Sequence, residues 1–84
     1  MTQSLPPEPL RQLVYRSHAA RPMDHPALRE LLEQARARNL AESITGLLVY
    51  HDGRFVQWLE GPPDNVERVW QSIQRDPRHV QVEA

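Results

Sequence analysis

The sequence predicts a two-layer α+β sandwich with elements in the order β-α-β-β-α-β. The first observation behind this prediction is size: 84 residues suffice for one domain only, and 39% hydrophobic residues is typical of a globular fold. The second is periodicity, because apolar residues alternate along four short segments and recur every three to four residues along two longer ones. We therefore expect four strands and two helices that are each apolar on one face.

The first half of the chain contains one predicted strand and one predicted helix. Residues 1–9, which carry three of the eight prolines, are expected to be a flexible lead-in to a strand over Leu10–Ser17. A helix is predicted over Pro26–Arg38, because its leucines recur at helical spacing and proline suits a first helical turn. Asn39 follows this helix, at a position where asparagine tolerates a left-handed backbone, so it is interpreted as a C-cap.

The second half contains the remaining strands and helix. A strand over Ile44–Tyr50 and a tight turn over His51–Arg54 are predicted to lead into a third strand, Phe55–Glu60. A second helix follows, with an apolar stripe that begins at Val66, and Val80–Glu83 is predicted to be a short last strand. This order is typical of the ferredoxin-like sandwich, in which two helices cover one face of a sheet, and we expect a mixed sheet.

The composition argues against several kinds of function. A formal net charge of −1 argues against nucleic acid or an anionic membrane as the main partner. The absence of cysteine excludes disulfides, thiolate catalysis and iron–sulfur clusters. The four histidines lack metal-ligand spacing, so no metal site is predicted. The apolar runs are too short for a membrane span and the N-terminus lacks a secretion signal, so a cytoplasmic protein is expected.

Gln57 is the most informative polar residue, because it lies mid-strand on a face that should be buried. A buried amide without partners costs ~1–3 kcal/mol, so Gln57 either bonds to nearby backbone or presents its donor and acceptor to a ligand. Tyr15 lies on the neighbouring central strand of this topology, so the two side chains are expected to meet. Its phenol is either a core group that needs one partner or a group that passes on a proton or an electron beside the amide.

Two further regions bear on function. Asn39 is either a helix cap that needs no ligand or an amide that reaches the polar edge of a heterocycle. Ser17 has no evident histidine or aspartate partner, so nucleophilic catalysis is not predicted. An acylphosphatase-type enzyme would need a glycine-containing loop after the first strand to hold an anion, and His18–Pro22 contains no glycine.

Five short segments have a characteristic order and spacing along the chain. They are LVYRS at 13–17, ARN at 37–39, ITGLL at 44–48, GRFVQWLEG at 53–61 and DPRH at 76–79. Together they resemble the BLUF family, the sensors of blue light using FAD, and the resemblance spans residues 10–83 without an insertion. It implies the ferredoxin-like fold and a flavin held non-covalently between the two helices and the sheet.

By this resemblance, Tyr15 is the photochemical tyrosine, Gln57 the switching glutamine and Asn39 the residue that anchors the flavin. The resemblance also implies further cofactor contacts from a serine, apolar walls and an Arg-His pair: Ser17, Leu32, Ile44, Arg78 and His79. The implied cofactor is FAD, with FMN or riboflavin as substitutes. In the implied mechanism the excited flavin takes an electron and a proton from Tyr15 by way of Gln57, and the Gln57 amide rearranges.

The resemblance divides the chain into the lead-in at residues 1–9 and a flavin-binding domain at residues 10–84. Family members normally continue into a fifth strand, whereas this chain ends at Ala84. We therefore expect an uncovered sheet edge, which favours self-association. We also expect weaker flavin binding or a faster dark recovery than in a longer chain.

The function expected from these features is that of a blue-light photoreceptor module that performs no turnover chemistry. Its expected partners are a flavin and either a downstream signalling protein or further copies of the chain in a homo-oligomer. The alternative is a ferredoxin-like protein-interaction module that no longer holds flavin. An acylphosphatase-type enzyme is the remaining alternative.

Overall fold

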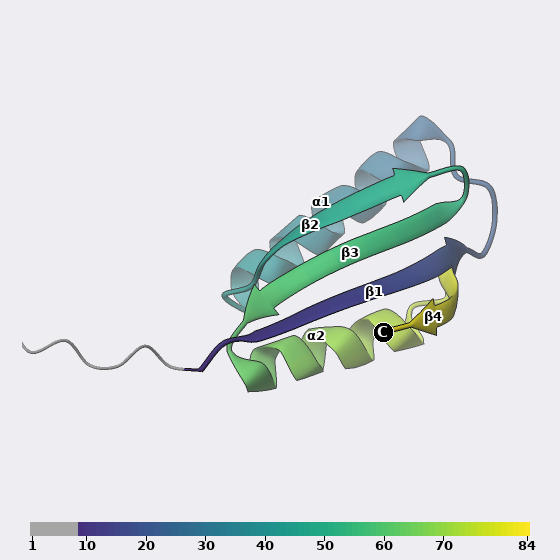
Figure 1. Cartoon of the computed structure of the whole chain (residues 1–84). Coiled ribbons are helices and arrows are strands. Elements are labelled where there is room, and N and C mark those ends of the chain that lie inside the picture. Colours follow the sequence, from purple (N-terminus) through teal and green to yellow (C-terminus); the bar gives the residue numbers. More distant parts are fainter. Residues whose placement is uncertain (1–8) are drawn as a thin grey trace, which may run out of the picture.

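The computed structural model describes residues 9–84, so the predicted lead-in lies outside the described residues except for Pro9. The elements follow the predicted order: β1 (Arg11–Ala19), α1 (His25–Ala41), β2 (Thr45–His51), β3 (Arg54–Gly61), α2 (Pro63–Arg75) and β4 (His79–Glu83). The helices form one layer and the sheet the other, with α1 on β2 and α2 on β1, β3 and β4 (Figure 1). The two-layer sandwich is therefore confirmed. Neither helix of residues 9–84 is long and apolar enough to cross a membrane.

The strand order is β2-β3-β1-β4, and all three neighbouring pairs are antiparallel. The expectation of a mixed sheet is therefore wrong for the described strands. Each helix connects two strands that run in the same direction, but these strands are not neighbours. β3 lies between β1 and β2, and β1 lies between β3 and β4. Because an antiparallel strand separates each parallel pair, no parallel ladder forms among them.

Both ends of α1 have a local cause. Asp24 caps its N-terminus, because the Asp24 side chain accepts a hydrogen bond from the backbone N–H three residues later at 2.9 Å. The helix continues to Ala41, so the interpretation of Asn39 as the C-cap is wrong. The left-handed backbone conformation falls instead at Ser43, with a φ of 56°. Asn39 stays helical, and its carbonyl oxygen accepts the N–H of Ile44 at 2.8 Å as the chain turns toward β2.

The connection between β2 and β3 is the predicted tight turn. Asp52 and Gly53 have φ values of 51° and 79°, and positive φ at both central residues is what a type I′ turn requires. Such a turn matches the twist of antiparallel strands and sets their register. As a result, Leu48 of β2 lies opposite Gln57 of β3 on the helix-covered face.

The hydrophobic core lies between the sheet and α2. Its buried members are Leu13, Tyr15, Ile44, Leu59, Val66, Val69 and Ile73. α2 contributes three of these residues, whereas α1 contributes none and has one buried side chain, Leu31. The helix α1 therefore stands over the sheet without filling the space beneath it.

Gly46 in β2 lies against the backbone of β3, where a Cβ atom would collide with the carbonyl oxygen of Trp58. Because this backbone atom cannot rotate away, Gly46→Ala should lower the free energy of unfolding by about 1–3 kcal/mol. Urea denaturation followed by circular dichroism measures the loss. The control is Gly53→Asn, where no neighbouring segment crowds a Cβ and only the positive φ of 79°, which asparagine tolerates better than other side chains, adds strain, so its loss should be smaller. Equal stability of the two variants contradicts the prediction.

Candidate functional site

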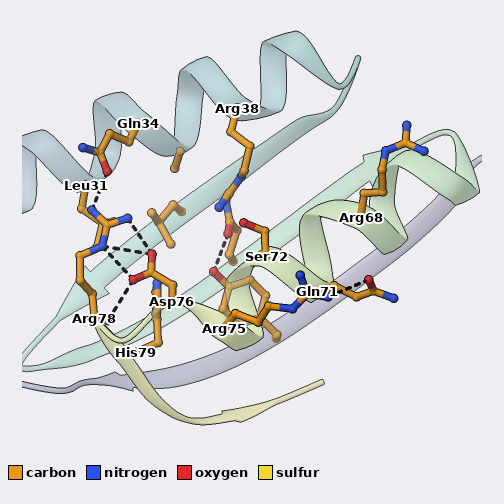
Figure 2. Close-up of a pocket in the computed structure, with 14 residues that line it drawn as sticks. Leu31, Gln34, Arg38, Arg68, Gln71, Ser72, Arg75, Asp76, Arg78 and His79 are labelled. Carbon is orange, nitrogen blue, oxygen red and sulfur yellow. Dashed lines mark hydrogen bonds and ion pairs between the residues drawn. The ribbon is translucent and has the colours of Figure 1, made fainter.

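A cavity of about 650 Å³ opens between the two helices, on the helix-covered side of the sheet. Figure 2 shows side chains from α1, from α2 and from the segment after α2 converging around it. Its floor consists of Tyr15, Leu48 and Gln57, which come from β1, β2 and β3. Because His79 of β4 also lines the cavity, all six elements contribute to its wall. The cavity therefore depends on the complete sandwich.

Tyr15 and Gln57 lie opposite each other on neighbouring strands, as the topology predicted. The Tyr15 hydroxyl donates a hydrogen bond to Oε1 of Gln57 at 2.6 Å, and each residue is 2% exposed. The partner of the buried amide oxygen is thus a side chain and not the nearby backbone. Because Gln57 also lines the cavity, its amide can form further hydrogen bonds with a ligand placed there.

The surroundings of Tyr15 determine its protonation state. Burial raises the pKa of the phenol to about 12, although the positive charge of Arg38 acts in the opposite direction. Tyr15 therefore keeps its proton throughout the neutral range and acts as the donor in its bond to Gln57. Arg38 extends from α1 into the cavity (Figure 2), and burial lowers the pKa of its guanidinium.

The segment after α2 closes one end of the cavity through an ion pair. Arg78 donates to both carboxylate oxygens of Asp76, with Nη2 at 2.6 Å from Oδ2, and these bonds lower the pKa of Asp76. Nη1 of Arg78 also donates to Oε1 of Gln34 on α1 at 2.7 Å (Figure 2). The Arg78 guanidinium therefore ties this segment to α1.

His79 and Ser17 form a second pair at this end of the cavity. Nδ1 of His79 lies 2.9 Å from the Ser17 hydroxyl oxygen, and the imidazole packs against Phe55 with ring centroids 4.8 Å apart. Burial lowers the pKa of His79, which the negative charge of Asp76 offsets in part. Ser17 does not line the helix cavity but a separate hollow beside β3 and β4. It therefore borders the site only through His79.

A second cavity of about 580 Å³ lies between α1 and β2. It shares Ala35, Leu48 and Gln57 with the first cavity, so Gln57 borders both. Three residues that the resemblance implied as cofactor contacts line this second cavity: Leu32, Asn39 and Ile44.

The predicted site residues thus fall into two groups on either side of Gln57. Tyr15, Arg78 and His79 line the first cavity together with Gln57. The second group, Leu32, Asn39 and Ile44, lines the adjoining second cavity. Ser17 lines neither. Their roles toward a cofactor stay predictions.

Both helices also present partly polar stripes to the first cavity, which apolar periodicity alone did not reveal. The stripe on α1 consists of Leu31, Gln34, Ala35 and Arg38, and that on α2 of Arg68, Gln71, Ser72 and Arg75. Both sets have the spacing i, i+3, i+4, i+7 of a single helical face. The spacing was therefore readable in the sequence, but polar residues at that spacing more often face solvent.

The lowered pKa of His79 makes the stability depend on pH. An unfolded histidine binds its proton near pH 6.5, whereas the fold keeps His79 neutral to lower pH. As the pH falls through this range, the unfolded state binds more protons, so the free energy of unfolding falls. Urea titrations at about pH 7.5 and about pH 5.5 should show a larger loss in the parent than in His79→Gln. Equal losses in the two proteins argue against this linkage.

Comparisons with known proteins identify the family of this chain. The family model for BLUF, described as sensors of blue-light using FAD, matches residues 10–84. Photoactivated adenylate cyclase subunit beta of Euglena gracilis is 45% identical over 73 residues, which are 87% of this chain and 8% of that protein. The chain thus spans less than a tenth of this relative.

Solved structures share the fold. The dark-state structure of BlrB, a BLUF protein, is 37% identical with a TM-score of 0.79, over 89% of this chain and 57% of that chain. The structure of Klebsiella pneumoniae BlrP1 with FMN and cyclic diGMP is 39% identical with a TM-score of 0.76, over 87% of this chain and 20% of that chain. The ferredoxin-like sandwich is therefore confirmed. With a family match over nearly the whole chain and this shared fold, the chain belongs to the BLUF family of blue-light sensors.

Proposed function

We propose that this chain is a blue-light sensing module that binds FAD non-covalently, with FMN or riboflavin as alternative ligands. The observation that carries the proposal is the buried Tyr15–Gln57 hydrogen bond, beside two cavities that both border Gln57. Family membership supports the ligand class, and the similar BlrP1 structure is one with FMN.

The lining residues suit a flat heterocycle with polar edges. Leu32, Ile44 and Leu48 offer apolar walls, and the amides of Asn39 and Gln57 offer donors and acceptors for ring carbonyl and nitrogen atoms. The arginines and hydroxyl of the two polar stripes suit a sugar-alcohol chain and a phosphate.

The Arg-His pair and the serine are proposed to support the site rather than to bind the ring. Arg78 already donates to Asp76 and Gln34, and His79 is paired with Ser17. These contacts hold the end of the cavity and the floor beside Tyr15 in place. Side chains fixed in this way keep a binding site in one geometry.

Tyr15 and Gln57 are the residues that respond to light in this proposal. A bound flavin supplies an excited state that accepts an electron. Tyr15 gives up that electron and passes its proton to the Gln57 carbonyl oxygen, which already accepts its hydrogen bond. When the electron and the proton return to Tyr15, the Gln57 amide has rearranged, so that its donor and acceptor groups have exchanged their positions toward the phenol. An amide suits this role because it has two hydrogen-bonding arrangements of similar energy.

The output is proposed to be a structural change passed to a downstream protein or to a second copy, with no turnover chemistry in this chain. The cyclase named in the Euglena gracilis relative is not carried over, because the chain spans only 8% of that protein. The alternative, an interaction module without flavin, keeps the fold and the Tyr15–Gln57 bond but leaves both cavities to water.

Absorption spectroscopy of the purified full chain separates these two functions. A light sensor is yellow, with a structured flavin band that shifts to the red under blue light and recovers in the dark. A protein that is colourless and stays so after incubation with FAD is the interaction module.

Asn39→Ala should weaken flavin binding with little loss of stability, because Asn39 lines the second cavity and does not cap α1. Loss of one amide hydrogen bond of about 1 kcal/mol weakens binding roughly fivefold, which flavin titration measures. The control is Asn65→Ala, whose amide donates to the Glu42 carbonyl at 2.8 Å outside both cavities. This control should lose stability and keep its flavin affinity. Unchanged affinity in Asn39→Ala removes the anchoring role.

Gln57→Leu should abolish the light-induced red shift and still bind flavin, because leucine keeps much of the volume but has neither donor nor acceptor. Difference spectra before and after blue light measure the shift. Gln71→Leu is the matched control, since Gln71 also lines the first cavity but lies on α2 and donates to Glu67 with no bond to Tyr15. It should keep the full shift. A normal red shift in Gln57→Leu assigns the switch elsewhere.

A further inference from the structure

Positive charge is concentrated along the first cavity. Its lining includes four arginines and a single carboxylate, that of Asp76. Arg78 already neutralises Asp76 through bonds to both carboxylate oxygens. The other three arginines, Arg38, Arg68 and Arg75, leave the lining with an excess of positive charge. A cavity with such a lining attracts an anionic group.

Two of these arginines lie on the same face of α2, one on either side of a hydroxyl. Arg68, Ser72 and Arg75 have the spacing i, i+4, i+7, and all three line the first cavity (Figure 2). Seven residues span about 10.5 Å of helix, so the two arginine side chains can bind one extended anion that lies over the serine. We call these three residues the α2 row.

The guanidinium groups of the α2 row have donors left for a ligand. Arg68 uses Nε for the Glu42 carboxylate at 3.0 Å and Nη2 for Oδ1 of Asn65 at 2.8 Å, and its Nη1 bonds to no other residue of 9–84. Arg75 donates one long bond, from Nη2 to Oε1 of Gln71 at 3.4 Å. Within the described part of the chain, Arg75 forms no ion pair.

We propose that the α2 row is a subsite for a diphosphate group, which makes the chain prefer FAD to FMN and both to riboflavin. This inference rests on the proposed function, because a flavin is the ligand that brings phosphate groups to the cavity. Arg68 and Arg75 donate to the phosphate oxygens from either side, and the Ser72 hydroxyl donates from between them. Riboflavin has no phosphate and gains none of these bonds, whereas the single phosphate of FMN gains fewer than a diphosphate.

The exposure of the α2 row suits a charged group. The Arg68 side chain is 59% exposed, whereas Tyr15 and Gln57 on the cavity floor are each 2% exposed. A diphosphate at the row keeps contact with water on its outer side, so it avoids the cost of burying an isolated charge. Exposed charges are screened by salt, so binding of the phosphates depends on ionic strength.

Titration of the flavin-free full chain with FAD, FMN and riboflavin tests the proposal. The parent should bind FAD most tightly and riboflavin least tightly. Arg75→Gln should weaken FAD binding about fivefold and leave riboflavin binding unchanged, because the variant lacks a charge that only the phosphates contact. Arg29→Gln is the matched control, since Arg29 is an arginine of α1 that lines neither cavity. It should keep the parent affinities.

The dependence on salt provides a second criterion. Raising sodium chloride from about 0.05 M to about 0.5 M should weaken FAD binding and leave riboflavin binding unchanged. Equal affinity of the parent for all three flavins overturns the subsite. An equal loss of FAD and riboflavin binding in Arg75→Gln overturns it as well, because damage to the whole cavity affects every flavin.

A measurement without flavin separates this proposal from the proposed function. A chain that binds no flavin contradicts the proposed function, and the subsite is then decided by inorganic pyrophosphate. Sodium pyrophosphate should raise the melting temperature of the flavin-free parent above its value in sodium chloride of the same ionic strength. Arg75→Gln should show a smaller rise and Arg29→Gln the full rise. In a chain that binds no flavin, equal melting temperatures of the parent in the two salts overturn the subsite.

Discussion

The antiparallel register between β1 and β3 is the constraint on which the rest of the structure depends. It pairs Tyr15 with Gln57, and a slip by one residue would move every side chain to the other face. The same register brings Leu13 beside Leu59 in the core and sets Val14 beside Trp58 on the face of the sheet away from the helices. The core and the candidate site therefore have one common cause.

The two helices have different roles, because α2 packs into the core whereas α1 borders the cavities. α2 buries three aliphatic side chains in the core, and burial of each such side chain contributes about 1.5–3 kcal/mol. α1 buries Leu31 and is held near its middle by a polar contact, the bond from Arg78 to Gln34. A helix held in this way leaves space between itself and its neighbours, where the two cavities lie.

The small net charge hides an uneven distribution of charge. Arginines from both helices line the first cavity, whereas Tyr15 on its floor is buried and its pKa rises to about 12. A neutral phenol next to an amide and near cationic groups is a suitable arrangement for the movement of an electron with its proton. The candidate site therefore depends on local charges and not on the total.

The sequence by itself determined the order of the elements, the ferredoxin-like class and the meeting of Tyr15 with Gln57. Alternation and helical spacing are local properties of the chain, and this topology makes β1 and β3 neighbours. The tertiary structure alone decided that the strands within residues 9–84 form no parallel ladder and that Asn39 lies within α1 beside a cavity. It also decided that polar stripes on both helices line the cavity between them. Spacing identifies a helical face, but only the packing of distant segments determines whether that face meets protein, a cavity or water.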